Sequence, residues 1–410
     1  MKKKVSSIIL LLVGIFLTSC SLNGRDSDDE NKETWVAVGI SYQKTYSTDE
    51  GLPAESKINS CHIVLFDEVG AFEKVVKLAS PSTGKSDVFT IPIGKKRILA
   101  FVNSPNSLAN YLENLGSNSN NTFGKVKEMS ITLTVSGDVS SYASYVDNSN
   151  GNFTMTNSDC DRVYDLKYYE TEADAKNAPV VIEVKRMVAK VDVKTRLTPS
   201  EGLLSLGEIE EVKTLVTCTN NSSYLFANVI DGIPQDVNFI RTDNTVATDY
   251  FKHSINDNSI WNNAKLVGSS SYSDPTYCLE NTNRFLDQYE DNTTHLIVRV
   301  KFKPSELVSG TFWHDAQKGF SSTNNGGTLF SDGYMYYRVY FKHDRNVPPV
   351  NDLIYGVVRS YWYRVSITKF TSLGNPTYQL PIKEKIIGDG NVQASISIEP
   401  WNVIEQEVKM

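Results

Sequence analysis

The sequence has few of the residues and motifs from which enzyme and metal sites are built. Its 410 residues include only five histidines and five cysteines, with no two-histidine helical spacing and no CxxC pair. Because zinc ligands occur in such spacings, no metal site is expected. The sequence also lacks a GxSxG motif, a Walker motif and a glycine-rich fingerprint opening a helix. These absences argue against an enzyme and predict neither a metal nor a cofactor.

Long basic tracts and long amphipathic helices are also missing. The formal net charge is −7, and phosphate binding needs a clustered cationic face, so nucleic acid is not expected as a partner. Strand-forming residues, serine, threonine, asparagine and glycine are abundant instead. This composition predicts an all-β protein with minor α content, and the length suits two β-domains.

The N-terminus has the pattern of a bacterial lipoprotein signal. Three lysines precede a short apolar run, Val5–Leu17, and the small residues that follow lead to Cys20. We expect residues 1–19 to be a signal peptide and Cys20 to become the first mature residue, carrying diacylglyceryl and acyl (palmitate) chains. Residues 20–33 are acidic and polar and are expected to be a flexible tether. This predicts a surface-exposed protein anchored in the outer membrane; an ordinary signal peptide with a chance cysteine is the alternative.

The segment Pro179–Leu197 organises the rest of the chain. It has the composition of a long strand, but its apolar residues change parity at Lys185–Arg186. Because side chains alternate with period two, this change indicates a bulge or a switch between sheets. We expect one β-sandwich domain over residues 34–185 and a second over residues 186–410. A single long strand with an irregular middle is the alternative.

Local patterns predict further elements. Trp35–Gln43 is a strand, and Lys44–Lys57 is a loop. Ser107–Gly116 is the clearest helix, with Ser107 as its cap and one apolar face formed by Leu108, Tyr111, Leu112 and Leu115. Four cysteines follow Cys20, and we favour free, mostly buried thiols over disulfides for Cys61, Cys160, Cys218 and Cys278.

Several motifs, taken in order, resemble the fimbrillins, the lipoprotein-derived pilins of type V pili. The N-terminal motifs are the lipobox at Cys20 and the segments Trp35–Gln43, His62–Gly70, Gly94–Asn103 and Arg186–Val191. The C-terminal motifs are similar to the minor-fimbrium group and comprise Gly333–Phe341, Tyr355–Ile367, Leu373–Pro376 and Val392–Trp401. The resemblance spans nearly the whole mature chain.

The resemblance implies two tandem β-sandwich domains of fimbrillin, transthyretin-like type, in a fimbrial subunit that supports adhesion. In that family the first strand, here residues 35–43, is a plug that a trypsin-like, usually Arg-specific protease releases. A C-terminal strand of the neighbouring subunit then fills the groove. The plug residues would be Val36, Val38, Ile40 and Tyr42. The candidate donor residues, which could instead close the second domain, are Ile396, Ile398, Ile404 and Val408.

The implied partners are other copies of the chain, sibling subunits, the membrane through the lipid, and a host or bacterial receptor. One departure from the family is the lack of arginine in the loop after the plug, which leaves Lys44 and Lys57 as candidate cleavage sites. An uncut anchor subunit or a tip subunit is therefore an alternative. A glycan-binding surface lipoprotein is another, with Trp261, Trp313 and Trp362 as aromatic platforms.

Overall fold

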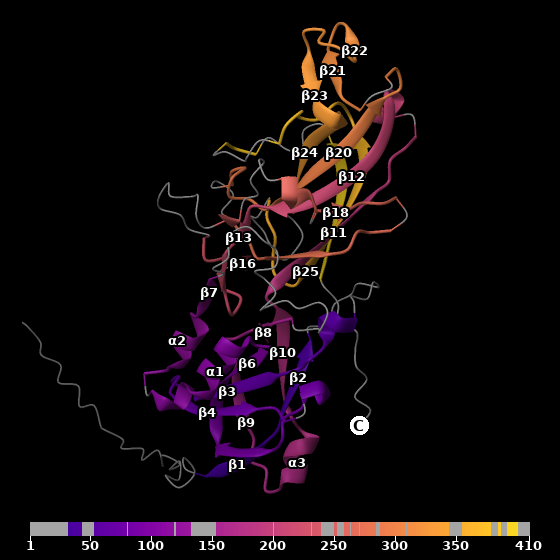
Figure 1. Cartoon of the computed structure of the whole chain (residues 1–410). Helices are drawn as coiled ribbons and strands as arrows, with labels where there is room; N and C mark the ends of the chain where they lie inside the picture. Colours follow the sequence, from indigo (N-terminus) through magenta and orange to yellow (C-terminus); the bar gives the residue numbers. More distant parts are fainter. Residues whose placement is uncertain are drawn as a thin grey trace, which may run out of the picture.

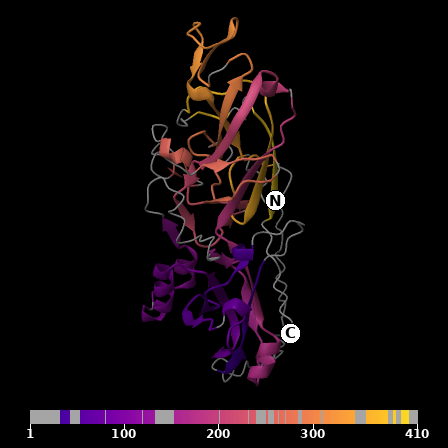
Figure 2. The same cartoon turned by 45° about the vertical axis from the view of Figure 1, so that its right-hand side comes forward.

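The computed structural model shows a protein built mainly from strands, which confirms the predicted all-β class. It describes residues 32–42, 53–79, 81–118, 120–132, 153–199, 201–230, 232–238, 250–251, 258–262, 264–269, 271–283, 288–307, 310–343, 355–378, 384–386 and 392–400. Figures 1 and 2 show an elongated molecule, with the N-terminal strands in one half and the C-terminal strands in the other.

The N-terminal half is organised around one large sheet. Its strand order is β2-β10-β8-β6-β3-β4, with β9 also paired to β6. The strands are β2 (Val38–Tyr42), β3 (Cys61–Asp67), β4 (Phe72–Lys77), β6 (Gly94–Val102), β8 (Met155–Asn157), β9 (Val163–Leu166) and β10 (Val180–Arg186). A separate two-stranded sheet joins β1 (Glu33–Val36) to β5 (Phe89–Pro92).

Both faces of the large sheet are covered, which explains why β3 is almost continuously apolar. One face packs against the β1–β5 sheet through residues such as Ile63 and Ile98. The other face packs against two helices, α1 (Asn106–Glu113) and α2 (Phe123–Lys127), through Val64 and Leu99.

Helix α1 is the helix predicted from the sequence, with two corrections. It begins at Asn106 after Pro105, without a side-chain cap, so Ser107 is not the capping residue. Leu108 and Leu112 are buried as expected, but Tyr111 is exposed. The apolar stripe of the helix is therefore narrower than the sequence pattern indicates.

The change of parity in the central segment is a switch between sheets. β10 pairs with β2 and β8, and the chain then passes Met187 and continues as β11 (Val188–Thr195). β11 pairs instead with β19 (Thr276–Leu279) and β25 (Tyr361–Phe370). The core is partly shared across the switch, because Tyr277 and Trp362 pack into the N-terminal cluster. The domain limits 34–185 and 186–410 remain a prediction.

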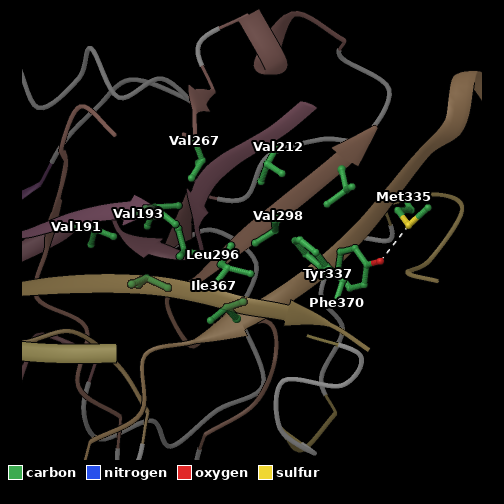
Figure 3. Close-up of a cluster of buried hydrophobic side chains, with 14 of the residues drawn as sticks. Val191, Val193, Val212, Val267, Leu296, Val298, Met335, Tyr337, Ile367 and Phe370 are labelled. Atoms are coloured by element: carbon green, nitrogen blue, oxygen red, sulfur yellow. Dashed lines mark hydrogen bonds between the residues drawn. The ribbon is translucent and has the colours of Figure 1, made fainter. Parts of the chain in front are cut away.

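The C-terminal half consists of two facing four-stranded sheets, β19-β11-β25-β26 and β18-β12-β20-β24. Their other strands are β12 (Gly207–Thr217), β18 (Lys265–Leu266), β20 (His295–Pro304), β24 (Tyr334–Tyr340) and β26 (Val392–Pro400). Figure 3 shows side chains from both sheets meeting in one apolar cluster, with Val193 and Ile367 on one side and Val298 on the other.

Several short strands form small sheets outside these three large sheets. β7 (Ser130–Thr132) of the N-terminal half pairs with β14 (Ser222–Tyr224) of the C-terminal half. The remaining small elements are α3 (Glu172–Asn177), β13 (Thr219–Asn220), β15 (Val229–Ile230), β16 (Ile233–Pro234), β17 (Tyr250–Phe251), β21 (Phe312–Asp315), β22 (Gly319–Ser321) and β23 (Thr328–Phe330). The three strands β22-β21-β23 form the tip at the top of Figure 1.

Candidate functional site

The first apolar segment is two strands rather than the single strand predicted. β1 runs antiparallel to β5, and β2 runs parallel to β10. The break falls at Ala37, whose carbonyl accepts a hydrogen bond from the Val180 N–H (2.8 Å) as the chain changes sheet. We call residues 33–42 the plug segment.

The apolar plug residues still serve one cluster despite the break. Val36 and Val38 are buried in the N-terminal core, and Ile40 is half-buried against it. The backbone of Tyr42 pairs with Val184 at the end of β2. The alternation in the sequence thus predicted the burial of Val36 and Val38 but not the change of sheet.

β2 is bonded along both of its edges. One edge of β2 pairs with β10. On the other edge, the Ser86 hydroxyl accepts from the Val38 N–H and the Ser86 N–H donates to the Val38 carbonyl, each at 2.8 Å. The Ile40 N–H donates to the Gly84 carbonyl at 2.6 Å. Removal of the plug segment would therefore expose unpaired backbone groups on two sides of a slot.

β1 is also held by a side chain that the apolar pattern did not single out. The Thr34 hydroxyl donates to the Lys167 carbonyl (3.0 Å) and accepts from the Tyr169 N–H (2.8 Å). Thr34 is 1% exposed. Thr34 has the same parity as Val36 and Val38, so the alternation of the strand could have predicted that its side chain is buried. The alternation could not have predicted which groups its hydroxyl binds.

The chain after the plug is held at Lys57. The Lys57 side chain is exposed, but its carbonyl accepts from the Asn103 amide at 2.7 Å. The Asn103 side-chain oxygen accepts from the Asn59 N–H, also at 2.7 Å, and Ile58 is buried. The peptide bond after Lys57 is thus part of the folded core's edge. The other candidate cleavage residue, Lys44, lies outside the described residues.

The short 3-10 helix η1 (Pro53–Ser56) fastens this region to the C-terminal half. The Glu55 carboxylate lies 2.8 Å from the Lys190 ammonium and accepts from the Tyr277 hydroxyl at 2.6 Å. The Glu55 carbonyl accepts from Arg186 Nε at 3.0 Å. Burial, with the adjacent Glu55 carboxylate, raises the pKa of Tyr277 far above its usual range, so its hydroxyl stays protonated and donates.

A second carboxyl group lies in the same junction. Asp192 accepts from the Trp362 indole N–H at 2.9 Å, and the Lys190 ammonium lies 3.9 Å from the centre of the Trp362 ring. Burial raises the pKa of Asp192 to about 7, although the Trp362 hydrogen bond and the Lys190 charge oppose that rise.

The described part of the candidate donor segment is an edge strand of its own sheet. β26 pairs antiparallel with β25 and ends the strand order, and Ile396 packs against the C-terminal core. The backbone of Ile398 pairs with Tyr363. Ile404 and Val408 lie outside the described residues, as does Cys20. Whether the tail donates therefore stays a prediction.

The proposed aromatic platforms are mostly closed. Trp261 and Trp362 are buried, and only Trp313 on β21 is half-buried. Two of the three rings therefore cannot offer a free stacking face to a sugar. This weakens the alternative of a glycan-binding lipoprotein.

The described residues contain no grouping of three or more His, Cys, Asp or Glu side chains that could hold a metal ion. Burial raises the pKa of the Cys160 thiol to about 11 and that of Cys278 to about 12, and Cys61 and Cys218 are buried as well. All four are free thiols in the structure.

Within the described part of the chain, no helix has both the length and the apolar character needed to span a bilayer.

Solved structures with a similar fold include a fimbrilin and two candidate cell adhesion proteins. A fimbrilin of Porphyromonas gingivalis is similar over 91% of this chain and 99% of its own, with a TM-score of 0.55 and 14% identity. Two candidate cell adhesion proteins of Parabacteroides distasonis have TM-scores of 0.52 and 0.51, at 14% and 18% identity. They cover 90% and 92% of this chain and 99% of their own. At such identities these likenesses establish the fold.

The fold is thus shared with a fimbrilin, and a family model matches part of the sequence. Residues 328–407 match the family model described as "Major fimbrial subunit protein type IV, Fimbrillin, C-terminal". This match lies in the C-terminal part of the chain. No curated protein has a sequence that matches this chain.

Proposed function

We propose that this chain is a lipid-anchored pilus subunit that polymerises when its plug segment is cut free and a strand from another subunit takes its place. The observation that carries the proposal is how residues 33–42 are bound. Their β2 part has backbone partners on both edges, and Val36 and Val38 pack into the N-terminal core. We call the groove that these residues fill the slot. A strand bound in this way can be replaced by another strand of similar pattern.

Proteolysis is a suitable trigger because the seated plug is held too firmly to leave unaided. Burial of an aliphatic side chain contributes roughly 1.5–3 kcal/mol, and each backbone hydrogen bond adds about 0.5–1.5 kcal/mol. Summed over the described plug, the gross stabilisation is on the order of 10 kcal/mol. Cleavage turns this into an intermolecular interaction that competing strands can displace.

The contacts after the plug restrict where the cut can fall. Glu55 is bound to Lys190 and Tyr277, and the Lys57 carbonyl is bound to Asn103. A cut after Lys57 would remove Glu55 with the plug and leave the Lys190 charge buried without this partner. We therefore favour a cut before Pro53, which leaves Lys44 as the lysine of choice.

The incoming strand would come from the C-terminal tail of the neighbour. β26 already forms the edge of its own sheet, and residues 401–410, with Ile404 and Val408, continue from it. In this arrangement the tail leaves its own subunit at the edge strand and enters the slot of the next. The lipid on Cys20 would hold the precursor in the outer membrane until cleavage.

Treatment of the purified precursor with a lysine-specific protease tests this function. We expect detergent-stable oligomers only after cleavage, and N-terminal sequencing should place the new start between Lys44 and Pro53. Lys44→Gln should stay monomeric, whereas Lys57→Gln should be cut and assemble normally. Cut protein that releases its plug and remains monomeric would contradict strand exchange.

An uncut anchor subunit is the second candidate, favoured by the lack of arginine between the plug segment and Arg97. Mapping the N-terminus of the protein on intact cells separates the two roles. A start at Cys20 in assembled fimbriae indicates an anchor, and a start after Lys44 indicates a polymer subunit.

A further inference from the structure

The contacts of the plug segment divide into two kinds. Most are made by its backbone, to β5, β10 and the segment 84–86, and any extended chain could reproduce them. Among the buried residues of the described plug, Thr34 is the only one with a polar side chain. Its hydroxyl therefore differs in kind from the other contacts.

The Thr34 hydroxyl links β1 to a segment that is not a strand. Its partners, the Lys167 carbonyl and the Tyr169 N–H, belong to the chain between β9 and α3 rather than to a ladder. A strand with an aliphatic residue at this register would remove the hydroxyl partner of both backbone groups and place an apolar side chain beside them. Each intramolecular hydrogen bond contributes about 0.5–1.5 kcal/mol, so the loss of two of them lets this position discriminate between strands.

We propose that the slot recognises its strand through this hydroxyl. The occupant is an extended segment of another fimbrial subunit that carries serine or threonine at the Thr34 register, with aliphatic residues two and four positions later. It runs antiparallel to β5 and then parallel to β10, as the resident plug does. This inference rests on the proposed strand exchange and names the feature that selects the incoming strand.

The candidate donor segment of this chain does not carry that feature in its described part. If Ile396 and Ile398 took the places of Val36 and Val38, Ala394 would stand at the Thr34 register. The hydroxyl rule therefore favours a strand from a sibling subunit over this part of a second identical copy.

Release of the cut plug tests the recognition directly, without requiring assembly. The full mature chain receives a specific protease site between Tyr42 and Pro53 and a fluorophore on the plug, and release after cleavage is followed by fluorescence anisotropy. We expect Thr34→Val, which keeps the shape and loses the hydroxyl, to release its plug at least about tenfold faster than the parent. Thr34→Ser should lie within about fourfold of the parent, because it loses one methyl group only.

Ser41→Ala is the matched control, since it removes a half-buried hydroxyl from the same segment, and it should release like the parent. Equal rates for Thr34→Val and the parent would overturn the proposal. The same holds if Ser41→Ala accelerates release equally, or if every variant keeps its plug until the whole protein unfolds. Failure of the cut protein to form oligomers would count against strand exchange alone, because release is measured on monomers.

Discussion

The ammonium of Lys190 lies 2.8 Å from the carboxylate of Glu55, and both side chains are almost wholly buried where the two halves of the molecule meet. Glu55 comes from the short helix after the plug segment, and Lys190 comes from the first strand beyond the sheet switch. The Tyr277 hydroxyl donates to the same carboxylate. The chain immediately after the plug is therefore tied to the C-terminal half by charge as well as by packing.

Removal of one charge from this pair should destabilise the protein strongly. Glu55→Gln removes the carboxylate that lies 2.8 Å from the buried Lys190 ammonium, and we expect the free energy of unfolding to fall by about 3–5 kcal/mol. Urea unfolding followed by fluorescence measures the change. Glu68→Gln is the control, because Glu68 pairs with Lys95 at 3.0 Å on the surface and should cost less than about 1 kcal/mol. Similar losses in both variants would show that burial does not increase the contribution of the Glu55–Lys190 pair to stability.

The peptide bond after Lys57 should resist trypsin in the folded protein. Its carbonyl is bound by the Asn103 amide, so cleavage requires local opening. Asn103→Gly removes the amide while suiting the positive φ of 53° at this residue, and cleavage after Lys57 should become about tenfold faster. Mass spectrometry of timed digests measures both rates, with cleavage after Lys77 in β4 as the internal reference. Rapid cleavage after Lys57 in the unchanged protein would contradict the assignment of the cut to an earlier residue.

The features that sequence predicted are those that depend on local periodicity. The parity change at Lys185–Arg186 predicted the sheet switch because alternation is fixed by strand geometry. The same rule identified Val36 and Val38 as core residues. The apolar spacing over Ser107–Gly116 predicted a helix, which the structure has at Asn106–Glu113 with Tyr111 exposed.

The features that sequence did not predict depend on partners far along the chain. Thr34 meets the Lys167 carbonyl across 133 residues, and Tyr277 meets Glu55 across 222. No local pattern encodes such pairs. The break at Ala37 also depends on a distant partner, because the Ala37 carbonyl binds the N–H of Val180, which lies in a strand much further along the chain.

The protein should lose stability as the pH rises from about 4 to about 7, in part through Asp192. Its pKa is about 7 in the folded state, above the value of about 3.9 expected in the unfolded chain. Within this window the folded state holds a proton that the unfolded state has lost, so higher pH favours unfolding, and the effect levels off above pH 7. Asp192→Asn can still accept from Trp362 and should flatten this part of the profile.

Thermal melting at closely spaced pH values measures this slope. Glu210→Gln is the control, because the Lys301 ammonium lowers the pKa of the exposed Glu210 carboxyl, and its removal should leave the slope above pH 5 unchanged. Some slope should persist in Asp192→Asn, since burial also raises the pKa of Asp236 to about 7. A profile for Asp192→Asn that superimposes on that of the parent would refute the assignment.

A charge placed within the plug segment should disrupt it in proportion to its burial. Val38 is fully buried between β10 and Ser86, so Val38→Asp loses its apolar contacts and buries a carboxylate. We expect it to lower the free energy of unfolding by more than about 4 kcal/mol, in the range of exceptional substitutions. Ile40→Asp should cost less because Ile40 is half-buried. Val229→Asp, at a side chain that is 54% exposed, should change stability by no more than about 0.5 kcal/mol. Chemical denaturation gives the order of the three variants, and size-exclusion chromatography should show misassembled species for Val38→Asp. If Val38→Asp melted like the parent and remained monomeric, the slot would not depend on its plug, and strand replacement would lose its physical basis.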